Sequence, residues 1–403
     1  MSPYALLRRA IGPSILLTLA TLSQVSSSAA QQGIGALSPL IQIALHLSLT
    51  QMGLLVSAIS LGMVVGQIPA GIVVDRRGAR WLIEWGGIAT AVVAVLLWRA
   101  DTFAELLLGL FLFGLMLGPV PTGGMRAVFN AYAPDRRGFA MGVRQAGVPV
   151  GSALSAACLP AAALAYGVHI VWLAFAALIL GTSTLFAAFI PAAPHGSGRL
   201  RSRDANISGA ISPMLIAFVL VSTQWCALAF VIVYLHAIQA WPYVDAGLGL
   251  AMVQVGGGIS RVLMGWWSDR IGRRGPLIVA LAAVASFSLG ALAVIPHRAA
   301  YALVMVILFS LGVGGVGWNG LTITWAGERV PASRAGQAMS WTTSAAYLGA
   351  SLYPPAFGAV VDITHRFAWA WAAVAGWVVI GGITAFATMQ KENRLHGGRC
   401  YAG

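Results

Sequence analysis

The sequence predicts an all-α membrane protein in which twelve transmembrane helices form two pseudo-symmetric bundles of six. Three observations support this fold class: the composition, the spacing of the apolar runs, and a charged motif that occurs twice. Of the 403 residues, 59% are apolar and only 9% are charged, whereas soluble domains carry roughly 25% charged residues. So few charges cannot cover a globular surface or solvate an open coil, which excludes a soluble enzyme and a disordered chain.

Apolar runs between short polar turns predict the individual spans, because about 20 apolar residues cross a bilayer as a helix. The first run also resembles a signal peptide, but we interpret it as a helix because its removal would leave an odd number of spans. The spans are expected near residues 12–36, 50–72, 80–99, 103–130, 139–164, 169–190, 211–236, 247–267, 276–296, 300–325, 336–359 and 368–389.

The longest polar interruption divides the chain into its expected domains. It is rich in Pro, Gly, Ser and Arg, a composition typical of a linker. We therefore expect an amino-terminal six-helix bundle over residues 1–192 and a cytoplasmic linker over 193–210. A second six-helix bundle is expected over 211–390, followed by a cytoplasmic tail over 391–403.

The distribution of basic residues predicts the orientation. With the amino terminus inside, the cytoplasmic segments contain eighteen Arg and Lys residues and the outer loops contain three. Positive charge gathers on the cytoplasmic side of membrane proteins, so both termini are expected in the cytoplasm and the protein in a bacterial-type inner membrane. The net charge of +13 is then explained by the bilayer surface, without nucleic acid as a partner.

A charged motif after the second span recurs after the eighth, 194 residues later. Gly71, Asp75, Arg76, Gly78 and Arg80 recur as Gly265, Asp269, Arg270, Gly272 and Arg274. A second echo pairs the turn at Pro134 with the turn at Pro331, so the two halves of the chain look duplicated. Parallel halves with a solute site between them are a recurrent transporter design.

These motifs resemble the signature of the major facilitator superfamily, and the twelve spans extend the resemblance over nearly the whole chain. The resemblance implies solute transport by alternating access, with spans 1, 4, 7 and 10 lining a central cavity. Asp75 and Asp269 end helices, where a negative charge opposes the helix dipole and needs a partner. We interpret both as parts of a latch between the halves, with Gly71 and Gly265 allowing close helix approach. The alternative is a charged anchor on the cytoplasmic side; for Arg76, Arg270 and the other motif arginines both interpretations stay open.

Polar residues at membrane depth are costly and therefore indicate function. Amides have more donors and acceptors to satisfy than a single hydroxyl, which can bond to its own helix. Within the spans expected to line the cavity, the candidate solute-binding residues are Gln24, Gln31, Gln224, Asn319 and Trp318.

Three arginines lie inside spans. Arg261 resembles the span-8 arginine of monocarboxylate- and oxalate-type facilitators, in which that residue pairs with the substrate carboxylate; a guanidinium fork fits such a group. A structural gate partner is the alternative for Arg261. Arg126 and Arg144 lie closer to the cytoplasmic boundary and are interpreted as members of a gate network. No carboxylate lies in the middle of a span, so a proton relay built on an acid has no support in the sequence.

These residues predict a secondary active or facilitative transporter of a small organic anion, such as a carboxylate. Two alternatives stay open: an exporter of drugs or hydrophobic compounds with the same fold, and a membrane sensor or assembly factor that does not transport. Enzyme activity, a cofactor and a metal site are not expected, because no nucleotide loop, metal spacing or hydrolase motif is present. The expected partners are the solute, a coupling proton or counter-ion, and the bilayer, with the chain as a monomer.

Overall fold

The computed structural model describes residues 12–47, 49–190 and 208–397, and in these ranges every regular element is helical. Twelve helical rods follow one another along the chain, two of them broken near the middle. The helices are α2 (Pro13–Leu45), α3 (Leu49–Arg77), α4 (Ala79–Leu97), α5 (Phe103–Leu117), α6 (Pro119–Ala131), α7 (Arg137–Tyr166), α8 (Val168–Phe189), α9 (Ser208–Ala237), α10 (Tyr243–Ile271), α11 (Gly275–Val294), α12 (Tyr301–Gly317), α13 (Asn319–Glu328), α14 (Ala335–Thr364) and α15 (Phe367–Gly397), with 3-10 turns η1 (Pro134–Arg136) and η2 (Ala332–Arg334).

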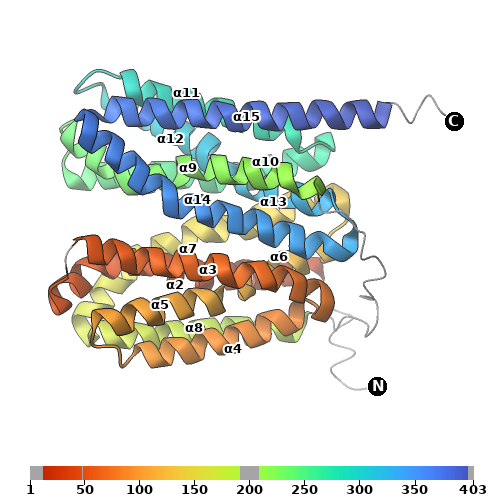
Figure 1. Ribbon diagram of the computed structural model, residues 1–403, viewed down its shortest axis with the longest axis horizontal. Helices are drawn as coiled ribbons and strands as arrows, with labels where there is room; N and C mark the ends of the chain where they lie inside the picture. Colours follow the sequence, from red (N-terminus) through yellow and green to blue (C-terminus); the bar gives the residue numbers. More distant parts are fainter. Residues whose placement is uncertain (1–11, 48, 191–207, 398–403) are drawn as a thin grey trace.

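The predicted fold class is confirmed: helices α2–α8 form one bundle and α9–α15 form the other (Figure 1). The fourth and tenth rods are broken at Gly118 and Trp318, where α5 passes into α6 and α12 into α13. Helix α9 begins within the predicted linker, and α15 continues into the predicted tail. The rest of the predicted linker, residues 193–207, lies outside the described residues.

Nine of the twelve rods in the described ranges are long and apolar enough to cross a membrane. The other three, α2, α7 and α14, contain 33, 30 and 30 residues. Their length suffices for a span, and their lower hydropathy reflects Ser, Gln and Gly residues on faces that meet other helices. Two of these three rods, α7 and α14, also pack on the opposite bundle.

The duplication is visible in how the rods of each bundle cross. A Cβ on Gly62 of α3 would overlap the backbone carbonyl of Phe111, and a Cβ on Gly256 of α10 would overlap that of Phe309. These pairs stand at matching positions of the two halves. Glycine therefore sets the same close backbone approach in both bundles.

The bundles meet mainly where α3 packs on α14 and α7 packs on α10. One buried apolar cluster crosses this interface and includes Val74, Met141, Ile323, Ala338 and Met339, all at most 1% exposed. The cluster lies toward the end of the molecule that carries the turns at residues 76–80, 134–137, 270–274 and 329–334, which we call the basic end. The two bundles are therefore packed together at the basic end.

Candidate functional site

A small cavity of about 50 Å³ lies between the two bundles. A single water needs roughly 10–15 Å³ of such space, so the cavity suits a solute of only a few heavy atoms. No acidic side chain is among the described residues that line it. Its polar lining comes from five helices and consists of Gln24, Gln31, Gln32, Arg144, Gln145, Gln224, Asn319, Thr343 and Tyr347.

Arg144 of α7 brings a guanidinium to this cavity, although its side chain is only 1% exposed. Its Nη2 donates to the backbone carbonyl of Pro121 at 2.9 Å, while Nε and Nη1 have no acceptor among the described residues. Gly124 leaves the space for this group, because a Cβ there would lie 2.9 Å from Arg144 Nη2. In the described chain Arg144 forms no ion pair either, so a buried cation faces the cavity with unused donors.

Arg261 of α10 is equally buried but does not line the cavity. Its donors are already engaged: Nε bonds to the carbonyl of Val316 at 3.0 Å and Nη1 to the carbonyl of Gln145 at 2.6 Å. Nη2 lies 3.4 Å from Gln224 Oε1. Arg261 therefore connects the two bundles and orients a glutamine of the cavity wall.

Four of the predicted solute-binding residues line the cavity: Gln24, Gln31, Gln224 and Asn319. Gln24 keeps a buried Oε1 and Gln31 a buried Nε2 without a partner in the described chain. The remaining candidate, Trp318, is placed differently. It is 1% exposed inside the second bundle, and its Nε1 donates to the carbonyl of Gly315 because the helix break turns the ring inward.

Asp75, at the end of α3, contacts the opposite bundle. Its Oδ1 and Oδ2 accept hydrogen bonds from the backbone N–H groups of Gly336 and Gln337, at 3.0 and 2.8 Å. These N–H groups open α14, where the helix dipole favours a negative charge. Arg126 of α6 lies 3.3 Å from Asp75 and also donates to the carbonyl of Ala332 in the second bundle. We call this group the first latch.

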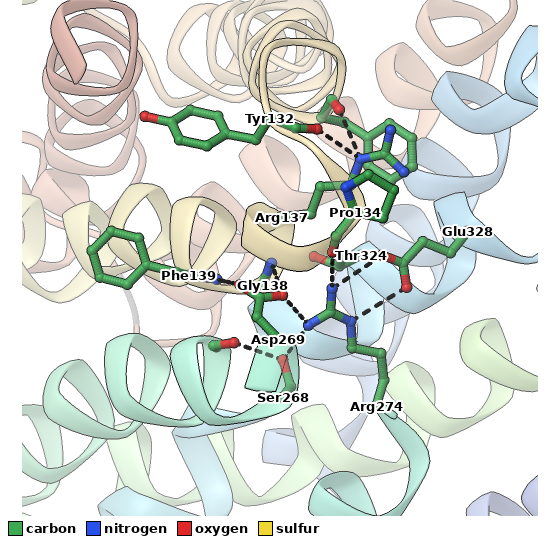
Figure 2. Close-up of polar contacts among 12 residues, drawn as sticks. Tyr132, Pro134, Arg137, Gly138, Phe139, Ser268, Asp269, Arg274, Thr324 and Glu328 are labelled. Carbon is green, nitrogen blue, oxygen red and sulfur yellow. Dashed lines mark hydrogen bonds and ion pairs between the residues drawn. The ribbon is translucent and has the colours of Figure 1, made fainter. Parts of the chain in front are cut away.

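Asp269, at the end of α10, makes the reciprocal contact, which Figure 2 shows. It accepts the N–H groups of Gly138 and Phe139 at the start of α7, at 2.8 and 2.7 Å. Arg274 pairs with Asp269 at 2.5 Å and with Glu328 at 3.1 Å. Arg274 also donates to Ser268 and to the carbonyl of Pro134 across the interface. We call this group the second latch.

Arg274 is the cation of the second latch and lies between two carboxylates. Burial alone would lower the pKa of Arg274, but the hydrogen bonds and charges of Glu328 and Asp269 raise it above its usual value. The guanidinium is therefore charged throughout the physiological pH range.

The motif glycines sit where the bundles touch. A Cβ on Gly71 would come within 2.7 Å of Ser340 Cβ in α14. A Cβ on Gly265 would overlap the backbone of Gly138. The structure thus has the close approach that the sequence predicted at both positions.

The other motif residues lie outside these contacts. Arg76 and Arg270 are exposed, and Arg270 covers the Trp266 ring at 4.0 Å. Arg80 lies 4.0 Å from Glu84 on the surface of α4. Gly78 and Gly272 have φ values of 85° and 67°, so each supplies the left-handed backbone that ends a helix.

The sequence profile of the Major Facilitator Superfamily matches residues 20–354 and, in an overlapping match, residues 214–398. The chain belongs to this superfamily. It is therefore a multi-pass membrane protein of a transporter superfamily, as its repeated motif and twelve rods predicted.

Relatives within the superfamily differ in what their names state. The chain is 28% identical over 307 residues to the uncharacterized MFS-type transporter Rv2994 of Mycobacterium tuberculosis, covering 74% of this chain and 68% of that protein. It is 28% identical over 300 residues to the probable nitrate/nitrite transporter NarK2 of the same organism, covering 72% and 74%. It is also 26% identical over 320 residues to the membrane sensor protein UhpC of Salmonella typhimurium, covering 72% of each.

Solved structures of superfamily members share the fold. The Escherichia coli fucose:proton symporter FucP superposes with a TM-score of 0.77 at 19% identity, over 94% of this chain and 99% of that one. The human organic anion transporter MFSD10 gives a TM-score of 0.74 at 15% identity, over 93% and 100%. At these identities the likeness shows the architecture alone.

The residues of the site that were not predicted from the sequence include Gln145, Tyr347, Arg274 and Glu328. Arg274 had a usable signal, because it occupies the position of Arg80 in the repeat. Gln145 directly follows Arg144, and adjacent residues of a helix point only about 100° apart. Tyr347 and Glu328 had no signal of their own, since their importance depends on which helix faces them.

Proposed function

We propose that this protein transports a small organic anion, with a monocarboxylate as first candidate, by alternating access. The observation that carries the proposal is the Arg144 guanidinium, buried at the cavity wall with two unused donors and no ion pair among the described residues. An unpaired buried cation is costly. A carboxylate would supply both the missing acceptors and the missing charge.

This proposal reassigns the two buried arginines relative to the sequence-based hypothesis, in which Arg261 bound the solute and Arg144 belonged to the gate. Arg261 already has acceptors on Val316, Gln145 and Gln224. We therefore assign the primary solute contact to Arg144. Arg261 holds α10 against α7 while the basic end is closed.

The two latches support alternating access. Each joins a helix end of one bundle to a helix start of the other, so both must separate before solute can leave through the basic end. The sequence-based count of eighteen basic residues on the expected cytoplasmic side supports a cytoplasmic position for the basic end. We propose accordingly an inner-membrane protein with both termini in the cytoplasm.

An inorganic oxyanion is the second candidate solute. The small cavity would accommodate nitrate or nitrite, and NarK2, a relative, carries those ions in its name. The hydrophobic-compound exporter is less compatible with a cavity of about 50 Å³ lined by amides and an arginine. The alternative of a membrane sensor is supported by the relative UhpC, which is named a membrane sensor protein. A sensor would differ from a transporter in that it carries no solute flux.

The test measures thermal unfolding of the purified protein against short monocarboxylates, nitrate, nitrite, a sugar and a lipophilic cation. A ligand at 100 times its Kd stabilises the folded state by about 2.7 kcal/mol. We expect a small anion to raise Tm in the wild type. In Arg144→Gln its Kd should rise about 10- to 100-fold, since bonds to a charged group contribute about 1.5–3 kcal/mol.

Arg76→Gln is the matched control, because Arg76 is exposed at the basic end. It should bind the anion as the wild type does. Arg144→Gln without ligand should be at least as stable as the wild type, because the unpaired buried charge is gone. Stabilisation by the lipophilic cation, or an equal anion effect in Arg144→Gln, would overturn the proposal. Flux of the stabilising anion into proteoliposomes then separates a transporter from a sensor.

A further inference from the structure

Gln145 is the residue of the cavity wall that is bonded twice to the opposite bundle. It lies on α7, is 5% exposed and lines the cavity. Its Nε2 donates to Asn319 Oδ1 of α13 at 2.9 Å. Its backbone carbonyl accepts Arg261 Nη1 of α10 at 2.6 Å. One residue of the first bundle is thus fixed in place by two helices of the second.

Directly below Gln145, toward the basic end, the backbones of the two bundles touch. A Cβ on Gly142 would overlap the carbonyl of Arg261. A Cβ on Gly320 would lie 3.4 Å from the Gly142 backbone. Met141 fills the same level and is 0% exposed. Among the described residues the backbones leave no room for a solute directly beneath Gln145, so its amide forms part of the floor of the cavity.

A second bond across the interface closes the cavity on its other side. The Tyr347 hydroxyl of α14 donates to Gln31 Oε1 of α2 at 3.1 Å. Tyr347 is twelve residues after the start of α14, and Gln145 is eight after the start of α7. The two levels are therefore about 18 and 12 Å from the basic ends of their helices. The cavity is thus bounded below by Gln145 and above by Tyr347.

We infer that Gln145, positioned by Asn319, is the specificity-determining floor of the cavity and limits the solute to the shortest anions. This inference rests on the proposed function and adds the size limit of the solute. A solute bound to Arg144 extends either toward Gln145 or toward Tyr347. Any extra methylene toward the floor meets an amide that cannot move without breaking its bond to Asn319.

The first experiment compares monocarboxylates of increasing chain length in Gln145→Ala, in Asn319→Ala and in the wild type. The wild type should favour the shortest acids. A pocket that excludes a methylene discriminates by about 10- to 200-fold, and Gln145→Ala should lose this discrimination for at least one added methylene. Asn319→Ala frees the amide without removing it, so its selectivity should lie between the two. Gln239→Ala is the matched control, because Gln239 is a buried glutamine outside the cavity lining whose amide bonds only within the second bundle, to Pro296 and Ala299.

Selectivity separates this role from a structural one. A variant that only loosened the fold would weaken all acids equally and leave their ratio unchanged. An unchanged ratio in both Gln145→Ala and Asn319→Ala would overturn the inference. The same ratio shift in Gln239→Ala would also overturn it.

The second experiment does not depend on the solute being an anion. Ala346 lines the cavity and is 7% exposed, so Ala346→Cys, in a chain with Cys158, Cys226 and Cys400 replaced by Ser, reports cavity size. Thiol reagents of two sizes are compared. The labelling rate of the large reagent relative to the small one should rise in Gln145→Ala and stay unchanged in Gln239→Ala, which does not line the cavity. If the ratio of the two labelling rates changes in Gln145→Ala while no anion binds, the proposed function is wrong and the role of Gln145 as the floor of the cavity is supported. If the ratio does not change, the role of Gln145 is wrong.

Discussion

The two latches of the basic end have the same arrangement of contacts, but their arginines come from different positions of the repeat. Asp75 and Asp269 each accept two N–H groups at the start of a helix in the other bundle. Arg126 in the first latch and Arg274 in the second then bond to a backbone carbonyl across the interface. The carbonyl groups belong to Ala332 and Pro134. These are the first residues of the matching turns η2 and η1.

The arginines themselves are not equivalent. The position of Arg126 in the second half is Thr324, whose hydroxyl bonds to its own helix. The position of Arg274 in the first half is Arg80, which lies on the surface near Glu84. The duplicated chain has therefore kept the geometry of the latch and not the source of its cation. The charge balance also differs, because Glu328 gives the second latch an additional carboxylate.

The largest effect is expected from Arg274→Gln, which leaves Asp269 and Glu328 side by side without their cation. Removing one partner of a buried pair costs about 3–5 kcal/mol, and we expect the lower end because the Glu328 side chain is 24% exposed. The basic end should therefore open on the order of 100-fold more often.

Thiol labelling of Ala140→Cys in a cysteine-free chain measures that opening, because Ala140 is 0% exposed beside the second latch. Ala338→Cys is the corresponding probe beside the first latch, at 0% exposed. A labelling rate that does not change in Arg274→Gln would contradict the assignment of Arg274 as the cation of the second latch.

The next effect compares Asp75→Asn with Asp269→Asn. Loss of Asp75 leaves Arg126, whose side chain is 11% exposed, without a carboxylate. Loss of Asp269 leaves Arg274 paired with Glu328. We expect Asp75→Asn to open the basic end about tenfold more than Asp269→Asn does, with little change in solute affinity.

A double variant sharpens this comparison. Asp75→Asn combined with Arg126→Gln removes both charges of the first latch, so it should be less open than Asp75→Asn alone. Labelling of the Ala338→Cys probe measures all three chains. Equal rates in Asp75→Asn and Asp269→Asn would show that Glu328 does not compensate.

The contrast between the latches also shows what the sequence could predict. The apolar runs predicted the twelve rods, because the hydropathy and length of a span depend only on residues that are neighbours in the sequence. The repeat gave the duplication, and the carboxylate at the end of a helix indicated that Asp75 and Asp269 need a donor. The close contacts of Gly71 and Gly265 could be predicted in the same way, because they depend only on a helix end and a small residue.

The partner of each carboxylate was not fully predictable. Arg126 is 51 residues from Asp75 in the chain, whereas Arg274 is five residues from Asp269. Arg144 lines the cavity, whereas Arg261 is bonded to other residues and does not line it. Which of these two positions an arginine takes depends on how its helix is rotated about its own axis. Each residue turns a helix by about 100°, and span edges predicted to within several residues do not fix that angle.

A smaller effect is expected from Glu328→Gln. Arg274 keeps its contacts with Asp269, Ser268 and Pro134, so no buried charge is left unpaired. The loss should be near 1 kcal/mol, the size of an ordinary hydrogen bond, and Ala140→Cys labelling should rise only several-fold. The informative measurement adds Asp269→Asn: the combined variant should be far more open than the sum of the single effects, because Arg274 then has no carboxylate left.

The smallest effect is expected from Arg80→Gln, at the position that corresponds to Arg274 in the repeated motif. Arg80 and Glu84 lie 4.0 Å apart with side chains 36% and 40% exposed. Such a surface pair contributes at most about 0.5 kcal/mol. Labelling at Ala338→Cys should therefore stay within about twofold of the wild type, against the large rise in Arg274→Gln. If Arg80→Gln opened the basic end as widely, Arg80 would have to enter the first latch in another state of the transport cycle, and the asymmetry between the latches would be limited to the state seen here.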